Sequence, residues 1–284
     1  MGSEEHPAQE IDRPGHEGEM AEQPQDEMRS YTGSEKLAGK VALVTGGDSG
    51  IGRAVAVAFA KEGADVAIAY LSEHEDAEHT RGLVEAAGRR ALLLPGDLQE
   101  EGRCTETVER TVAELGALDV LVNHAATQTP VDSPEEITTE QWMGTFATNV
   151  HSHFWVTRAA LAHLPDGAAI IFTGSINGLR GNKSLIDYAA TKGAIHVFAQ
   201  SLAQALLERR IRVNVVAPGP VWTPLIPATM PAEKVETFGQ QTPMGRAAQP
   251  DEIAPSYVFF ASEVLSSYYT GEVLAPVGGE TLPG

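Results

Sequence analysis

The sequence predicts an α/β fold built on a doubly wound parallel sheet of about seven strands, with helices on both faces. Two observations carry this prediction. Short apolar runs alternate with helical stretches from Gly39 onward, and such alternation is typical of a parallel sheet that is covered on both sides. A glycine-rich turn also follows the first apolar run, at the position where sheets of this kind hold phosphate groups.

Each strand is predicted from a run of aliphatic residues, and each helix from the longer stretch between two runs. The expected strands are Lys40–Thr45, Ala64–Tyr70, Ala91–Leu94, Leu118–Val122, Ala168–Phe172, Ile211–Val216 and Glu272–Ala275. The expected helices are Gly50–Lys61, 74–88, 99–115, Thr139–Leu164, Ile186–Glu208 and one that begins near Asp251. The pattern shows no repeat and no interruption, so residues 39–284 are predicted to form a single domain.

The first 38 residues differ in composition from this domain. Residues 1–36 contain ten acidic and three basic residues, a net charge of −7, and their few apolar residues show no periodicity. Such a segment cannot bury enough surface to fold alone. Residues 1–38 are therefore expected to be an extended or disordered arm, which either stays free or packs across its own domain or a neighbouring subunit.

Composition excludes several classes of partner. The chain has 284 residues and a formal net charge of −19, which argues against binding to nucleic acid or to an anionic membrane surface. No apolar run approaches the roughly 20 residues that span a bilayer, and the N-terminal residues do not resemble a secretory signal. With Cys104 as its single cysteine, the chain is expected to be cytoplasmic.

The glycine-rich turn is Thr45–Gly46–Gly47–Asp48–Ser49–Gly50–Ile51–Gly52. It lies between the first strand and the first helix, where a Rossmann-type fold binds the pyrophosphate of a dinucleotide. Glycines allow a tight turn and a close approach to phosphates, and the helix N-terminus offers N–H donors. The G-x-x-x-G-x-G spacing lacks the G-K-[ST] ending of an ATP-binding loop.

Tyr188 and Lys192 are four residues apart in a predicted helix. That spacing places both side chains on one helix face, one turn apart. A phenol with a pKa near ~10 is a poor base at neutral pH, but an adjacent ammonium favours the phenolate and lowers that pKa. The pair can then exchange a proton with an alcohol or carbonyl oxygen.

Further motifs occur in a fixed order along the chain. They are Asp97–Leu98, Asn123–His124–Ala125–Ala126, Asn149, Ser175 thirteen residues before Tyr188, and Pro218–Gly219. With the glycine turn and the Tyr188/Lys192 pair, they resemble the short-chain dehydrogenase/reductase family over residues 39–284. The Gly-Gly-Asp-Ser-Gly turn and the acidic arm are similar to those of bacterial oxidoreductases that include NADP-dependent aldehyde reductases.

The resemblance implies a catalytic set of Asn149, Ser175, Tyr188 and Lys192. Tyr188 would donate the proton, and Ser175 would hold the substrate oxygen. Lys192 would bind the nicotinamide ribose and lower the pKa of Tyr188. Asn149 would lie at a local distortion of the helix before the fifth strand, where a water connects Lys192 to solvent.

The resemblance also implies a set of cofactor-binding residues. Asp97 and Leu98 would meet the adenine, and Thr223 would meet the nicotinamide carboxamide. The full set is Gly46, Asp48, Ser49, Gly50, Ile51, Gly52, Tyr70, Leu71, Ser72, Asp97, Leu98, Asn123, Ala125, Tyr188, Lys192, Pro218, Gly219, Val221 and Thr223.

NADP is the expected cofactor, with NAD as the second possibility. An NAD-specific site carries an acid at the end of the second strand, about 20 residues after the glycines. Here Tyr70, Leu71 and Ser72 stand at that end, and the nearest acid is Glu73, which is expected to face solvent. Ser72 is expected to donate a hydrogen bond to the 2′-phosphate and Arg53 to supply charge to it, although Ser49 replaces the basic loop residue of many NADP-dependent relatives.

The activity that follows is hydride transfer between a nicotinamide and an aldehyde or ketone. An epimerase or dehydratase, and a cofactor-sensing regulator without turnover, remain as alternatives. The expected pocket residues are Gln128, Ile176, Asn177, Gly178, Trp222 and a lid at Leu225–Phe238. A homotetramer is expected, in which the helix at Ile186–Glu208 presents small residues to a partner. No metal site is expected, because no Cys/His cluster has ligand spacing.

Overall fold

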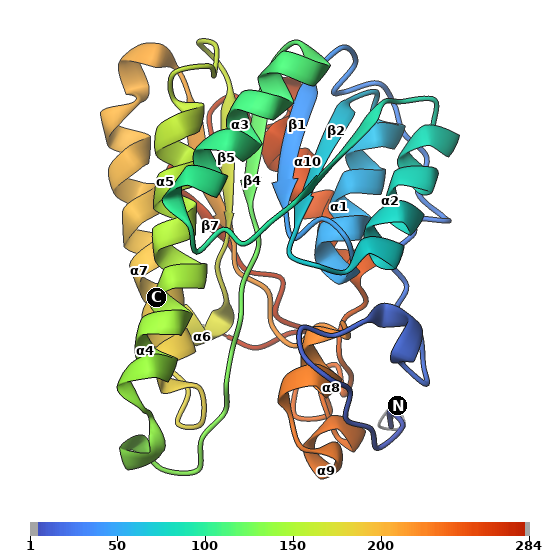
Figure 1. The fold of residues 1–284 in the computed structure, drawn as a ribbon, viewed down its shortest axis with the longest axis vertical. Coiled ribbons are helices and arrows are strands. Elements are labelled where there is room, and N and C mark those ends of the chain that lie inside the picture. The colour runs from blue at the N-terminus through green and yellow to red at the C-terminus, as the bar shows by residue number, and fades with distance from the viewer. Residues whose placement is uncertain (1–4, 282–284) are drawn as a thin grey trace.

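A computed structural model describes residues 5–281, and their seven strands form one parallel sheet (Figure 1). The strands are β1 (Val41–Thr45), β2 (Asp65–Tyr70), β3 (Ala91–Pro95), β4 (Val120–Asn123), β5 (Ala169–Thr173), β6 (Arg212–Val216) and β7 (Val273–Leu274). Their order in the sheet is β3-β2-β1-β4-β5-β6-β7. The predicted doubly wound fold is therefore confirmed.

Eleven α-helices and four shorter helical turns lie within the described residues. The helices are α1 (Gly50–Lys61), α2 (His74–Ala86), α3 (Glu101–Leu115), α4 (Thr139–Phe146), α5 (Ser152–Ala160), α6 (Ile176–Arg180), α7 (Ile186–Ala205), α8 (Leu225–Thr229), α9 (Ala232–Glu236), α10 (Pro250–Ala261) and α11 (Glu263–Ser266). The turns are η1 (Glu17–Glu19), η2 (Pro134–Glu136), η3 (Ala147–His151) and η4 (Leu207–Arg209). The single helix predicted at Thr139–Leu164 is thus divided by η3, which is π-helical.

The central strands of the sheet are buried on both faces, because most of their residues are apolar. In β1, Ala42 and Val44 pack on one face, with α1 and α10, while Val41 and Leu43 pack on the other, with α3, α5 and α7. Successive side chains of a strand point to opposite faces, so an uninterrupted aliphatic run can fill two helical layers at once.

The strand order changes direction at β1. The chain runs outward from β1 through β2 to β3, and then returns to place β4 on the other side of β1. A crevice opens at such a switch point beyond the carboxyl ends of the strands. The glycine-rich turn after β1 and the loop after β4 both lie at this edge, so the fold itself positions the candidate site.

The N-terminal arm, defined here as residues 5–38, packs against its own domain beside α8 and α9 (Figure 1). The His6 ring stacks on Trp222, with ring centroids 3.8 Å apart. The backbone N–H of Ile11 donates to the carbonyl of Pro227 at 3.1 Å, and Met20 joins Trp222 in a small apolar cluster. Few apolar side chains are needed, because the arm joins a core that is already formed.

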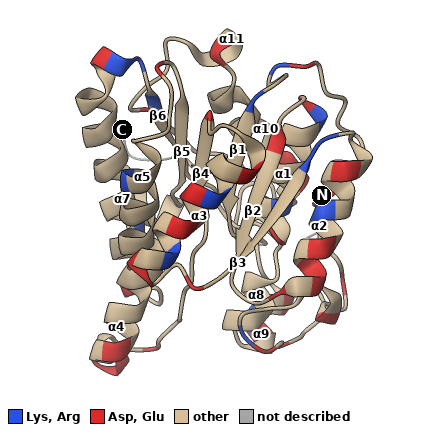
Figure 2. Cartoon of the chain, turned by 45° about the horizontal axis from the view of Figure 1, so that its top comes forward, with Lys and Arg blue, Asp and Glu red and all other residues tan. Residues whose placement is uncertain are grey.

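Negative charge is spread over the outer helices. Figure 2 shows acidic residues along α2 and α3, on the surfaces that face away from the sheet. Within residues 5–281, no helix is both long enough and apolar enough to cross a membrane.

Candidate active site

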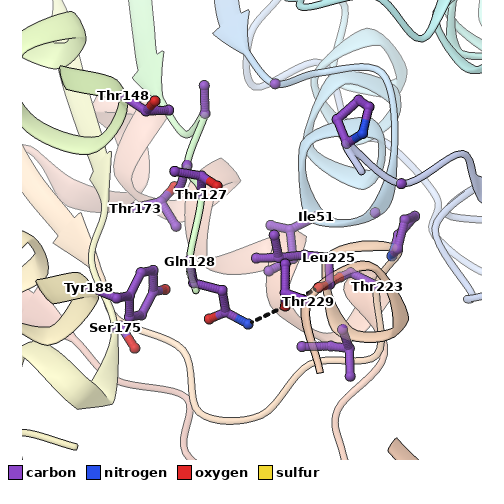
Figure 3. A pocket seen from close by; sticks show the side chains of 18 of the residues that line it. Ile51, Thr127, Gln128, Thr148, Thr173, Ser175, Tyr188, Thr223, Leu225 and Thr229 are labelled. Carbon is purple, nitrogen blue, oxygen red and sulfur yellow. Dashed lines mark hydrogen bonds between the residues drawn. The ribbon is translucent and has the colours of Figure 1, made fainter. Parts of the chain in front are cut away.

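A cavity of about 970 Å³ lies at the carboxyl ends of the strands. In Figure 3, Tyr188 and Ser175 stand on one side, Ile51, Thr223 and Leu225 on the other, and Gln128 reaches across to Thr229. Lining residues come from the glycine turn, from the ends of β2 to β6, from α8 and α9, and from the arm. The cavity therefore joins segments that are distant in sequence.

Ser175, Tyr188 and Lys192 meet at one end of this cavity. Ser175 follows β5 and caps α6, and its Oγ accepts the Asn177 N–H at 3.1 Å. Tyr188 lies in the first turn of α7, and its side chain stands beside Ser175 (Figure 3). Lys192 follows one turn later, and its Nζ lies 5.5 Å from the centre of the Tyr188 ring. The i, i+4 spacing predicted from the sequence thus brings phenol and amine together.

Burial controls the protonation of this pair. It raises the pKa of Tyr188 to about 12, against a smaller lowering by the Ser175 hydrogen bond. It also lowers the pKa of Lys192 to about 7, and Lys192 Nζ donates to the Thr173 carbonyl at 2.7 Å. The expectation that Lys192 lowers the pKa of Tyr188 is wrong for this structure, because desolvation disfavours both charged forms. A protonated phenol is nevertheless the form that can donate a proton.

Asn149 lies in the π-helical turn η3 and is fully buried. Its amide accepts from the N–H of Thr127 at 2.8 Å and donates to the carbonyl of Thr127 at 2.9 Å. It also donates to Thr191 Oγ1 at 3.1 Å. The helix distortion expected around Asn149 is present, and its side chain fastens the loop after β4 to α7.

The glycine turn is shaped for close contact. Gly46 has a φ of +65°, and an added Cβ would lie 3.1 Å from Ala125 Cα. At Gly52 an added Cβ would lie 1.8 Å from the Gly46 carbonyl oxygen, so only glycine lets α1 start this close to the turn. Gly46, Asp48, Ser49, Gly50 and Ile51 line the cavity. This cradle fits the diphosphate of a dinucleotide.

Comparison with known proteins agrees with this geometry. Residues 46–281 match the family model described as "Enoyl-(Acyl carrier protein) reductase". The chain is 57% identical to General stress protein 39 of Bacillus subtilis over 274 residues, 96% of each chain. It is 48% identical to NADPH-dependent aldehyde reductase 1, chloroplastic, of Arabidopsis thaliana, covering 94% of this chain and 95% of that one.

A solved structure gives the same result. The fold matches a short-chain dehydrogenase from Burkholderia cenocepacia J2315 in complex with NADP, with a TM-score of 0.81 and 33% identity over 86% of this chain and 98% of that one. This chain belongs to the short-chain dehydrogenase/reductase family. The family that the motif order predicted is confirmed, and with it an oxidoreductase.

Most of the residues predicted for the cofactor line the cavity of this dehydrogenase/reductase. Beyond the glycine turn they are Tyr70, Leu71, Asp97, Leu98, Ala125, Tyr188, Lys192, Pro218, Gly219, Val221 and Thr223. Four predicted site residues do not line the cavity, namely Gly52, Asn123 and Asn149, which are buried, and Ser72, which is exposed. Asn123 is fully buried and donates to Thr157 Oγ1 at 3.0 Å, so it holds β4 against α5.

The end of β2 differs from the sequence expectation. Glu73 is 4% exposed and lines the cavity instead of facing solvent. Ser72 donates to Glu73 Oε1 at 2.6 Å, which occupies the hydroxyl that was expected to meet a phosphate. Burial, followed by the nearby charge of Glu73, raises the pKa of Asp48 to about 7. Two carboxyl groups, Asp48 and Glu73, therefore line the cavity near the end of β2.

Arg53 does not face the cavity, so its predicted role is wrong. It is 1% exposed and forms ion pairs with Glu17 and Asp26 of the arm. Asp26 also accepts the N–H of Gly50 at 2.9 Å. Burial raises the pKa of Asp26 to about 9, with Arg53 lowering it and Glu17 raising it. A buried cation must be paired, and here the arm supplies the partners.

Trp222 and Gly178 also lie outside the cavity wall. Trp222 is fully buried beneath the arm, where its Nε1–H donates to the carbonyl of Glu22 at 3.0 Å. At Gly178 an added Cβ would lie 2.7 Å from the Lys192 carbonyl carbon, so this glycine serves the packing of α6 on α7. The other expected pocket residues Gln128, Ile176 and Asn177 do line the wall.

Sequence reasoning missed the contribution of the arm. Arg13, Pro14 and Gly15 line the cavity, although no motif or periodicity marks them. Among residues 5–281, no group of three or more His, Cys, Asp or Glu side chains is placed to hold a metal ion.

Proposed function

We propose that this dehydrogenase/reductase reduces aldehydes or ketones with NADPH. The observation that carries the proposal is the meeting of Ser175, Tyr188 and Lys192 at the end of a cavity that begins at a glycine-rich turn. The names of the Arabidopsis aldehyde reductase and the NADP complex from Burkholderia support the choice of substrate and cofactor.

The chain's residues have distinct tasks in this reaction. A bound nicotinamide would supply the hydride. As the carbonyl carbon accepts it, negative charge grows on the oxygen and must be met by positioned donors. The Tyr188 phenol, protonated at neutral pH because of its raised pKa, donates its proton to that oxygen. Ser175 holds the oxygen by a hydrogen bond, and Lys192 provides positive charge beside both.

The alternatives receive less support. After β6 the described chain contains only the short helices α8 and α9 before α10, which is little room for the larger C-terminal domain of many epimerases and dehydratases. A regulator without turnover would not need the full set of Asn149, Ser175, Tyr188 and Lys192.

Cofactor choice is expected to depend on pH. Below about pH 7 Asp48 carries a proton and is neutral, whereas above it the ionised carboxylate repels a 2′-phosphate. We therefore expect kcat/KM to favour NADPH over NADH at pH 6.5, with a ratio that falls by pH 8.5. The measurement is initial rates with both cofactors and one aldehyde at the two pH values. A tenfold preference for NADH at pH 6.5 would contradict the assignment of NADP.

The protein is also proposed to be a cytoplasmic homotetramer. Cys104 is buried as a free thiol, which fits a reducing compartment. Phe154 on α5 and Val197 on α7 are 42% and 63% exposed, and exposed apolar residues on adjacent helices are typical of subunit interfaces. Light scattering at micromolar concentration should give four times the 30.2 kDa chain mass, and a monomer mass would refute it.

A further inference from the structure

The arm forms part of the cavity wall through Arg13, Pro14 and Gly15. Gly15 lies tightly against α8 and its N-cap residue, since an added Cβ would stand 3.0 Å from the Pro224 oxygen and from Ala228 Cβ. On either side, Ile11 hydrogen bonds Pro227, and Glu17 pairs with Arg53. These anchors fix the backbone of Arg13 beside α8 and the start of α1.

From this fixed position the Arg13 side chain crosses the cavity. Its guanidinium Nη1 donates to Thr129 Oγ1 at 2.9 Å, and Thr129 belongs to the loop that follows β4 on the opposite wall. A second bond crosses in the same way, from Gln128 Nε2 to Thr229 Oγ1 of α8 at 2.9 Å (Figure 3). Arg13 therefore connects the arm, which packs on α8, to the loop that follows β4.

The glycine turn packs against both the loop after β4 and the residues that precede α8. An added Cβ at Gly46 would approach Ala125 of the loop after β4 at 3.1 Å, and one at Gly50 would approach Thr223 at 3.0 Å and Pro224 at 3.6 Å. Pro224 thus lies beside both Gly50 and Gly15 of the arm. Through Pro224, the backbone segment that carries Arg13 therefore lies next to the glycine turn.

Of the basic residues on the wall, Arg180 and Lys234 have carboxylate partners, whereas Arg13 and the deeply buried Lys192 have none among the described residues. Arg180 pairs with Glu280, Lys234 lies 3.9 Å from Asp132, and Lys192 stands beside Tyr188. For Arg13, no carboxylate of residues 5–281 lies within ion-pair distance, and its partner is a neutral hydroxyl. A guanidinium that lines the cavity and bonds only a neutral hydroxyl has unused donors.

We propose that Arg13 binds the bridging diphosphate of the dinucleotide, so that the N-terminal arm closes the cofactor site from above. This inference rests on the proposed function. The planar guanidinium matches two phosphate oxygens at once, and the glycine turn meets the same group with backbone N–H donors. The arm thereby supplies a positive charge to the cavity. Arg53 does not supply one, because it is buried and paired with Glu17 and Asp26.

The test compares Arg13→Gln with Arg29→Gln, which removes the same charge from the same arm. Arg29 is exposed, pairs with Glu27 and does not line the cavity. Binding of NADPH and of NADH is measured by fluorescence titration, and their release by stopped flow. We expect Arg13→Gln to weaken both cofactors by about 10- to 100-fold, mostly through faster release, while Arg29→Gln binds both as the wild type does.

Two further measurements distinguish the loss of a phosphate contact from a loss of arm docking. With Trp142 and Trp155 replaced by Phe in every protein compared, the emission of Trp222 without cofactor reports whether the arm is still docked, because Trp222 stacks on His6. The variant Thr129→Val removes the acceptor but keeps the guanidinium, so it should weaken binding far less than Arg13→Gln does. If Thr129→Val weakened cofactor binding as much as Arg13→Gln does, the role of Arg13 would be only to hold the arm to the loop after β4. That result would overturn the proposal.

The other outcomes are equally decisive. A loss confined to NADPH would place Arg13 on the 2′-phosphate and overturn the diphosphate assignment, as would unchanged binding of both cofactors. If the wild type binds neither cofactor, the proposed function itself fails. If the wild type binds and oxidises NADPH but Arg13→Gln binds it normally, only the inference about the arm fails.

Discussion

Replacing Tyr188 by Phe is expected to lower kcat for carbonyl reduction by at least ~10²-fold while the affinity for NADPH stays near that of the wild type. The variant keeps the ring and its packing on α7 but removes the hydroxyl beside Ser175 (Figure 3). Without that proton donor, the charge on the substrate oxygen is met by Ser175 alone. The contacts proposed for the diphosphate and ribose lie elsewhere in the cavity and remain intact.

The measurement is kcat under saturating substrates, together with the NADPH dissociation constant from fluorescence. Tyr268→Phe is the matched control, because Tyr268 is 97% exposed and lies far along the chain from the cavity residues. Turnover by Tyr188→Phe within a few-fold of the wild type would remove Tyr188 from its assigned role.

Replacing Lys192 by Met is expected to reduce kcat/KM by roughly 10²-fold or more and, unlike the Tyr188 change, to weaken NADPH binding as well. Lys192 is buried, and Met has a similar length without charge. The change removes both the positive charge beside Tyr188 and the donor assigned to the nicotinamide ribose. Lys40→Met, at the opposite end of β1, is the control.

The lowered pKa of Lys192 predicts the direction in which activity changes with pH. Burial lowers the pKa of Lys192 to about 7, so the amine is charged below pH 7 and neutral above it. If the charged form is required, kcat/KM for NADH, which has no 2′-phosphate for Asp48 to repel and which reports ionisations of the free enzyme, falls as the pH rises through 7. Lys192→Met should lack that decline. A decline that persists in the variant would assign it to another group, with Asp48 as the next candidate.

The fold was predictable because its signals are local. Aliphatic runs such as Val41–Thr45 can fill two helical layers only in a covered parallel sheet. The turn from Gly46 to Gly52 needs glycine wherever the backbone closes on itself. The i, i+4 spacing of Tyr188 and Lys192 likewise needs nothing beyond helix geometry to bring the two side chains together.

The residues that were assigned wrongly depend on contacts that no local pattern encodes. In the sequence Arg53 has no marked partner and is therefore predicted to meet a phosphate. In the structure it pairs with Glu17 and Asp26, which lie some 30 positions earlier in the chain. Trp222 looked like a pocket residue but supports the arm through His6. The pKa of Tyr188 is raised mainly by burial. How deeply the side chain is buried depends on the assembled fold, so the spacing of Tyr188 and Lys192 in the sequence does not reveal it.

Transfer of hydrogen from cofactor to substrate tests the central claim most directly. The wild-type protein is incubated with an aldehyde and with NADPH that carries deuterium at both C4 positions of the nicotinamide, and the alcohol is analysed by mass spectrometry. The account predicts one deuterium on the carbon that bore the carbonyl oxygen, formed in step with NADPH oxidation. An alcohol without deuterium, or no NADPH oxidation with any member of an aldehyde and ketone panel, would contradict it.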